Sequence, residues 1–240
     1  MLAEALSTTA SVEPCASCGA RAASVCNVVP DADLGRLAAA AMVRMVPAGA
    51  AFMDEGEPAA HFFNVTAGTA RLFKLLPDGR RQILGFARPG HFLGLAPADA
   101  YVVSAEAVEP MWVCRFRRED VHRLVREFPA LERRLLESAP NELAAAQEGM
   151  VLLGRKTARE RLASFLLGWA TGGRSCAPPA RELHLPMSRG DIADYLGLTV
   201  ETVSRTLTTL RKAGLIALPE PSEVRLLRPN ALAAIAAGEG

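Results

Sequence analysis

The sequence has no long apolar run and no segment that resembles a targeting signal. Its longest apolar stretches, such as Leu37 to Val43, are well short of the roughly 18 residues needed to cross a bilayer, and Arg44 interrupts this one. The first 12 residues carry Glu4 but no Lys or Arg, so the basic start of a secretory signal is missing. We therefore expect a cytoplasmic protein with no membrane partner.

Motifs for catalysis are also missing. The 240 residues contain no paired acid–base side chains, no phosphate-binding glycine loop and no nucleophile motif, so we expect no enzymatic activity. Hydrophobic residues make up 50% of the chain and charged residues only 22%, a balance that excludes intrinsic disorder. A chain of this length and composition is expected to form two globular domains.

The charge is unevenly distributed along the chain. The net charge is only +1, but the residues from Arg155 onward hold 12 basic and 8 acidic side chains, whereas the preceding 154 residues hold 15 and 18. A basic C-terminal third joined to a slightly acidic remainder is typical of a nucleic-acid-binding module attached to a sensing domain.

Four regions follow one another in the sequence. Residues 1–29 lack periodicity and form an arm that other parts of the chain must order. Residues 30–116 contain short apolar runs separated by regularly placed glycines, which predicts an all-β domain with a hairpin turn at Leu76 to Arg80. Helical periodicity begins in residues 117–156, and residues 157–240 begin with a further amphipathic helix.

Apolar side chains in residues 117–156 recur at alternating steps of four and three, the spacing of a coiled-coil seam. A narrow seam on a long helix needs a partner, which a twofold homodimer supplies; the alternative is packing on the chain's own β domain. Pro140 costs a helix about 3 kcal/mol, so the helix either begins near it or is kinked there. The seam consists of Ala139, Leu143, Ala146, Met150 and Leu153.

The segment from Ser188 to Leu210 has the sequence pattern of a helix-turn-helix. Ser188 and Thr199 are suited to cap the two helices, and Gly197 lies at the turn between them. Ala193 is small at the point where the helices must cross closely. The residues that follow, 215–218 and 224–227, predict a short hairpin or wing.

The second helix of this motif is expected to enter the major groove of DNA. Glu201, Ser204 and Arg205 share one helical face, and their side chains can read a G·C pair and its neighbour. Alternatively, Glu201 and Arg205 form an exposed ion pair worth about 0.3–0.5 kcal/mol, a pair that also orients the arginine on DNA. Further DNA-binding candidates are Arg189, Thr199, Arg211 and Lys212.

Three of the five cysteines, Cys15, Cys18 and Cys26, are spaced C-x2-C-x7-C in the arm. In a cytosolic protein such a cluster binds a metal more often than it forms disulfides. The fourth ligand must come from elsewhere, and Cys114 and Cys176 are the candidates, with a role as a small buried residue as the alternative for Cys114. Four thiolates suit either zinc or an iron–sulfur cluster.

The β-rich sensor, the dimer helix and the segment GDIADYLGLTVETVSR, preceded by the cysteines, resemble the Fnr branch of the Crp/Fnr transcription regulators over nearly the whole chain. The resemblance implies an α+β fold with an N-terminal β-roll like the cyclic-nucleotide-binding jelly roll, a long dimerisation helix and a C-terminal winged helix-turn-helix. The implied boundaries are an arm at 1–29, the β-roll at 30–116, the dimer helix region at 117–156 and the DNA-binding domain at 157–240.

The resemblance also implies a mechanism. Cys15, Cys18, Cys26 and Cys114 would hold an oxygen-labile [4Fe-4S] cluster, and the cluster-bearing homodimer would bind inverted repeats of TTGAT in double-stranded DNA and recruit RNA polymerase. The seven-residue gap before Cys26 is a variant of the family spacing, which bears on the lifetime of the cluster more than on its type.

Two other branches of the family are the alternatives. Nucleotide-binding members carry a Gly-Glu pair and an Arg, and both are missing from residues 90–105; because a buried phosphate needs a cation, we expect no cyclic nucleotide. A regulator that senses a haem-bound gas or thiol redox state, without an iron–sulfur cluster, is the second alternative. The histidines available to a haem are His61, His91, His122 and His184.

Overall fold

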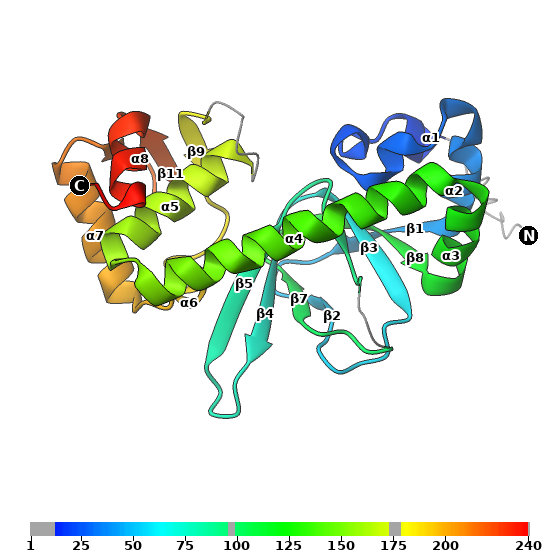
Figure 1. Ribbon diagram of the computed structural model, residues 1–240, viewed down its shortest axis with the longest axis horizontal. Coiled ribbons are helices and arrows are strands. Elements are labelled where there is room, and N and C mark those ends of the chain that lie inside the picture. The colour runs from blue at the N-terminus through cyan, green and yellow to red at the C-terminus, as the bar shows by residue number, and fades with distance from the viewer. Residues whose placement is uncertain (1–12, 96–98, 173–178, 240) are drawn as a thin grey trace, which may run out of the picture. The chain divides into compact units, whose positions relative to one another are not determined.

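The computed structural model describes residues 13–95, 99–172 and 179–239 of the chain. It divides into two compact units (Figure 1). Unit 1 comprises Met1–Ala70 and Ala87–Ala139, and unit 2 comprises Arg71–Phe86 and Pro140–Gly240. Over the described ranges, none of the helices combines the length and the apolar character that crossing a membrane requires.

Unit 1 is built on an antiparallel sheet with the strand order β1-β8-β3-β6. The pairing register places Cys114 of β8 between Val43 of β1 and Asn64 of β3. A further antiparallel pair consists of β2 and β7. The strands of this unit are β1 (Ala41–Val46), β2 (Ala51–Met53), β3 (His61–Ala67), β6 (Phe92–Leu93), β7 (Ser104–Ala107) and β8 (Met111–Arg117).

The described part of the N-terminal arm, residues 13–29, packs against this sheet. Val25 and Val29 of the arm are buried in one apolar cluster with Leu37, Phe62 and Phe116. The strands begin only at Ala41, so residues 34–40, which the sequence pattern assigned to the β domain, are helical. The helices here are α1 (Glu13–Ala16), η1 (Arg21–Ala23), η2 (Val25–Val28), η3 (Asp31–Asp33), α2 (Leu34–Ala40) and α3 (Arg118–Glu127).

Helix α4 (Pro129–Arg155) begins in unit 1 and ends in unit 2, with Pro140 inside it. Of the two alternatives for Pro140, a helix that begins near it is wrong: α4 begins earlier, and Pro129 occupies its first turn, where a missing N–H costs nothing.

The predicted seam of α4 is largely exposed. Leu143 and Met150 are 61% and 72% exposed, and so is Leu136, at 66%, seven residues before Leu143. Ala146 is exposed and Leu153 is half-buried, while the side chain of Ala139 lies outside what the structure describes. The described residues of the chain therefore leave most of the predicted seam uncovered.

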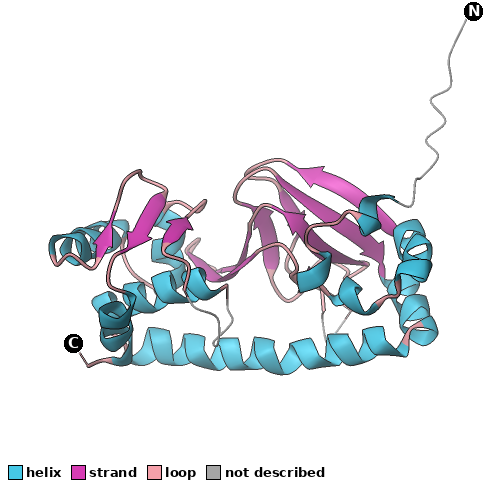
Figure 2. Cartoon of the chain, turned by 90° about the horizontal axis from the view of Figure 1, so that it is seen from above, coloured by secondary structure: helices cyan, strands magenta, loops and turns pink. Residues whose placement is uncertain are grey.

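The described residues of unit 2 contain four further helices and a three-stranded sheet with the order β10-β11-β9. Figure 2 distinguishes the helices from the strands by colour. The predicted wing is confirmed as the antiparallel pair β10–β11. The β4–β5 hairpin also belongs to this unit, and Gly79 at its turn has a φ of 85°. The elements are β4 (Ala70–Leu75), β5 (Arg81–Ala87), α5 (Ala158–Thr171), β9 (Glu182–His184), α6 (Arg189–Leu196), α7 (Val200–Lys212), β10 (Ile216–Ala217), β11 (Glu223–Leu226) and α8 (Pro229–Ala237).

Candidate functional sites: a helix-turn-helix and a four-cysteine pocket

The caps of the helix-turn-helix are those that the sequence predicts. Ser188 Oγ accepts from the Asp191 N–H at 3.0 Å, and the Asp191 carboxylate accepts from the Ser188 N–H at 3.0 Å, which completes a capping box at the start of α6. Thr199 Oγ1 accepts from the Thr202 N–H at 3.1 Å and caps α7. Gly197 ends α6 with a φ of 60°, a conformation that a residue with a side chain rarely adopts. These local bonds fix the start of each helix, and Gly197 forms the tight turn between them.

Helix α7 presents one buried face and one exposed face. Val203 and Leu210 are fully buried within unit 2. On the other side, Glu201 and Arg205 are exposed and form the predicted ion pair. Ser204 accepts from Arg189 Nη1 at 3.2 Å, so this face also includes the start of α6.

Four of the seven DNA-binding candidates thus form one exposed group, in which Arg189 meets Ser204 and Glu201 meets Arg205. Thr199 is exposed at the N-terminus of α7. Arg211 and Lys212 are exposed in its last turn, where a positive charge is also favoured by the helix dipole. The arrangement offers hydrogen-bonding groups on the exposed face of α7 and two cations in its last turn.

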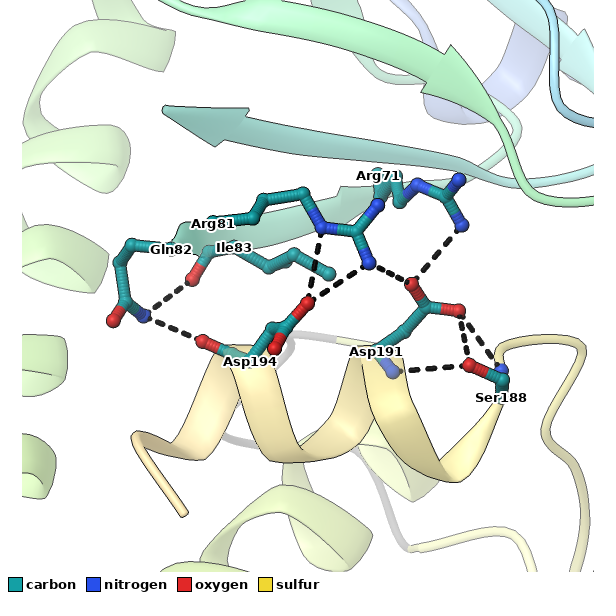
Figure 3. Close-up of polar contacts among 7 residues, drawn as sticks. All are labelled: Arg71, Arg81, Gln82, Ile83, Ser188, Asp191 and Asp194. Atoms are coloured by element: carbon teal, nitrogen blue, oxygen red, sulfur yellow. Dashed lines mark hydrogen bonds and ion pairs between the residues drawn. The ribbon is translucent and has the colours of Figure 1, made fainter. Parts of the chain in front are cut away.

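The sequence analysis did not identify Arg71 and Arg81 of the β4–β5 hairpin, which hold α6. Both guanidinium groups contact the buried carboxylate of Asp191, at 3.0 and 2.8 Å (Figure 3). The sequence carries no signal for this, because the two arginines lie more than a hundred residues before their partner.

The four cysteines expected to act together line a single cavity of about 250 Å³ in unit 1. Cys15, Cys18 and Cys26 come from the arm, and Cys114 comes from β8. All four are free thiols; Cys26 is buried and the other three are half-buried. For comparison, an engineered apolar cavity of about 150 Å³ is large enough to bind benzene. The pocket therefore has room for a polyatomic group among its thiols.

Burial governs the ionisation of these thiols. Burial raises the pKa of Cys114 to about 12, with a further contribution from Cys15, Cys26 and Cys18. Burial also raises the pKa of Cys26 and of Cys15, while the nearby guanidinium of Arg21 acts in the opposite direction. Burial of the side chains therefore favours the neutral thiol form of Cys15, Cys26 and Cys114.

Two polar residues that the sequence analysis did not single out also line the cavity. Asn64 is only 2% exposed, and its Oδ1 atom is buried without a hydrogen-bond partner. Arg21 donates to the Val29 carbonyl at 2.8 Å and pairs with Asp31, while its Nε is buried without a partner. Arg21 could have been suspected from its place between the cysteines, but nothing in the sequence marks Asn64.

The described part of the chain, the four cysteines included, contains no assembled site for a single metal ion, since its His, Cys, Asp and Glu residues form no group of three with the spacing for one. The described residues that line the four-cysteine cavity include no histidine. Cys176, the other candidate for a fourth ligand, lies outside the described residues.

Comparisons with known proteins identify two domains in the chain. Residues 43–128 match the family model of the cyclic nucleotide-binding domain, and residues 160–235 match that of the Crp-like helix-turn-helix domain. The chain is similar to the solved structure of FixK2 from Bradyrhizobium japonicum, with a TM-score of 0.76 and 36% identity over 81% of this chain and 96% of that one.

Curated relatives span nearly the same length. The nitrogen fixation regulation protein FixK of Bradyrhizobium diazoefficiens is 43% identical over 93% of this chain and 94% of its own. The transcriptional activator protein FnrL of Cereibacter sphaeroides is 37% identical over 85% of this chain and 84% of its own. Since both domains and most of the length match, this chain belongs to the Crp/Fnr family of DNA-binding transcription regulators.

Proposed function

We propose that this protein is an oxygen-responsive transcription activator whose Cys15, Cys18, Cys26 and Cys114 hold an oxygen-labile [4Fe-4S] cluster. The observation that carries the proposal is the single cavity shared by these four thiols. Four cysteine sulfurs are the usual ligand set of such a cluster. Several relatives in the comparisons are named as transcriptional activators, among them FnrL and the Anr protein of Pseudomonas aeruginosa, which supports the activator role.

The residues of the pocket fit such a group. A cluster bound by thiolates is anionic at its ligands, and the cavity contains Arg21, a cation whose Nε–H is buried without a hydrogen-bond partner. A buried N–H donor of this kind can donate a hydrogen bond to a cluster sulfur. Bound there, the cluster would supply the sensitivity to oxygen, and this chain's residues would supply four ligands and a cation.

The DNA-binding form is proposed to be a homodimer. Leu136, Leu143 and Met150 are exposed at seven-residue intervals along α4, which is the spacing of one seam position in a coiled coil. A twofold dimer about this seam would present two copies of α7 to an inverted repeat. We propose TTGAT-type half-sites in double-stranded DNA, with Glu201, Ser204 and Arg205 reading base edges, and recruitment of RNA polymerase by the bound dimer under low oxygen.

One experiment separates the proposed cluster from its alternatives. The protein is purified without oxygen and its visible spectrum is recorded together with iron, acid-labile sulfide and zinc contents. We expect four iron and four sulfide per chain, as the composition of a [4Fe-4S] cluster requires. Stoichiometric zinc without sulfide would contradict the proposal, and a haem spectrum or metal-free thiols would leave a haem-based or thiol-redox sensor in its place.

A further inference from the structure

Side chains of the β4–β5 hairpin bind α6, the first helix of the helix-turn-helix, near both ends of that helix (Figure 3). At the N-terminal half of α6, Asp191 Oδ1 accepts from Arg71 Nη1 at 3.0 Å and from Arg81 Nη2 at 2.8 Å. One turn further on, Asp194 Oδ2 accepts from Nε and Nη2 of Arg81, at 3.0 and 2.9 Å. A single guanidinium thus links two carboxylates of one helix.

The C-terminal end of α6 is bound by the next residue of the same strand. Gln82 Nε2 donates to the carbonyl of Asp194 at 2.8 Å and lies 3.4 Å from that of Tyr195. Carbonyls in the last turn of a helix lack intrahelical donors, so this amide satisfies groups that would otherwise need water. Strand β5 therefore contacts both ends of a two-turn helix.

Apolar contacts join the base of the hairpin to the same unit. The ring of Phe86 lies 5.7 Å from that of Tyr195 in α6 and 6.0 and 6.3 Å from those of Trp169 and Phe165 in α5, measured between centroids. Ile83, also in β5, is 1% exposed. An aromatic cluster therefore adds apolar contacts to the hydrogen bonds and ion pairs between the hairpin and α6.

The carboxylate of Asp191 is buried and is shared between the cap of α6 and the hairpin arginines. Its side chain is only 4% exposed. One oxygen, Oδ2, is used inside the helix, where it accepts from the Ser188 N–H and Oγ at 3.0 and 2.7 Å. The other oxygen accepts from the two hairpin arginines. Burying a carboxylate without charged partners costs free energy. The two arginines of the hairpin therefore stabilise α6 by pairing with the Asp191 carboxylate.

We propose that Arg71 and Arg81 are positioning residues for DNA recognition. In the sequence the hairpin lies inside the cyclic nucleotide-binding domain, between β3 and β6, yet it holds α6 of the DNA-binding unit. Since α6 and α7 are fixed to each other by the turn at Gly197, holding α6 sets the direction in which α7 meets DNA. The inference rests on the proposed dimer, because direction matters most when two recognition helices must fit two half-sites at once.

The test measures how strongly the protein discriminates between half-site spacings. Affinities of the full-length anaerobic protein are measured for an inverted repeat of TTGAT-type half-sites at the preferred spacing and for repeats one base pair shorter and longer. We expect Arg81→Ala to reduce the ratio of preferred to altered affinity on the order of tenfold, as loss of a charged hydrogen-bonded contact would. Partial unfolding would lower all three affinities by one factor and leave this ratio unchanged.

Two more variants sharpen the test. Arg80→Ala is the matched control, because Arg80 is the neighbouring arginine of the same hairpin, is 78% exposed at its side chain and pairs with Asp78 within the hairpin; it should keep the wild-type ratio. Asp194→Ala removes the partly exposed partner of Arg81 without touching the cap of α6. It should reduce the ratio too, and the Arg81→Ala, Asp194→Ala double variant should lose less than the two single losses combined.

The outcomes separate this inference from the proposed function. If Arg81→Ala and Asp194→Ala both fold and keep the wild-type spacing ratio, the hairpin does not position the recognition helix and the inference is wrong. If the wild type itself is monomeric on DNA or ignores spacing, the proposed dimeric mode of binding fails and the inference fails with it.

Discussion

At the scale of single residues, Arg205 is exposed on the outer face of α7 beside Glu201. An ion pair this exposed contributes little to stability, so its replacement tests DNA recognition rather than folding. We expect Arg205→Ala to cost about 1–3 kcal/mol of binding free energy at one G·C pair in each half-site and to relax the preference there. Affinities for matched and base-substituted half-sites across a salt series measure this.

Arg211→Ala and Lys212→Ala are the controls for that experiment. Both side chains are exposed at the end of α7, where we expect phosphate contacts. Their loss should weaken binding to all sequences alike and flatten its salt dependence, since a phosphate carries no base information. If Arg205→Ala lowers the affinity for every sequence equally, Arg205 does not read bases, and its role is limited to the ion pair with Glu201.

Asn64 is a second residue whose role can be tested alone. Its buried amide has an unpaired oxygen, which costs a folded protein about 1–3 kcal/mol, and an apolar residue of similar size removes that cost. We therefore expect Asn64→Leu to leave the iron-free protein as stable as the wild type or more so. Because Asn64 lines the cysteine cavity, replacing its polar amide with an apolar side chain should also shorten the lifetime of the anaerobic cluster. Thermal unfolding of the iron-free form and the decay of the cluster absorbance measure the two effects.

The contrast for Asn64 is Thr66→Val. Thr66 also lines the cavity, but its hydroxyl donates to the Trp112 carbonyl at 3.0 Å and so is already used in folding. This variant should lower stability slightly and leave the lifetime of the cluster unchanged. If the lifetime of the cluster is unaltered in Asn64→Leu, the Asn64 amide does not stabilise the bound cluster.

At the scale of elements, the exposed seam of α4 is the proposed dimer contact. Leu143 is 61% exposed, so a charge there does not disturb the folded chain, but in a twofold dimer it would place like charges near one another. We expect Leu143→Glu to shift the anaerobic protein to monomer in sedimentation equilibrium. Ala145→Glu, an exposed position off the seam, is the matched control and should remain dimeric.

At the scale of the whole molecule, the proposed switch links the four-cysteine pocket to the seam. Two of the five predicted seam residues are alanines, which bury little area, so the dimer should be marginal. We expect exposure to air to shift the protein toward monomer as the cluster is lost, and Cys114→Ser to do so without air. Cys176→Ser is the control and should retain both cluster and dimer.

Sedimentation and iron analysis on the same samples check this link. A dimer that is equally tight with and without the cluster would contradict a monomer–dimer switch and would leave a rearrangement within the dimer as the response to oxygen.

Local chemistry explains which features could be predicted from the sequence. The caps at Ser188 and Thr199, the turn at Gly197 and the hairpin turn at Gly79 depend on residues a few positions apart, so their side chains alone specify them. The exposed face of α7 follows from helical periodicity for the same reason. The family resemblance supplied the fold class, which the domain matches confirm.

Contacts between distant residues were decided only by the tertiary structure. The residue pattern left Cys114 as one of two candidates, and it was the pairing of β8 with β1 and β3 that brought it to the arm cysteines beside Asn64. Helix α4 runs through Pro140, against the local preference of proline. Arg71 and Arg81 meet Asp191 across more than a hundred residues, because burial of that carboxylate favours any cation the fold can bring to it.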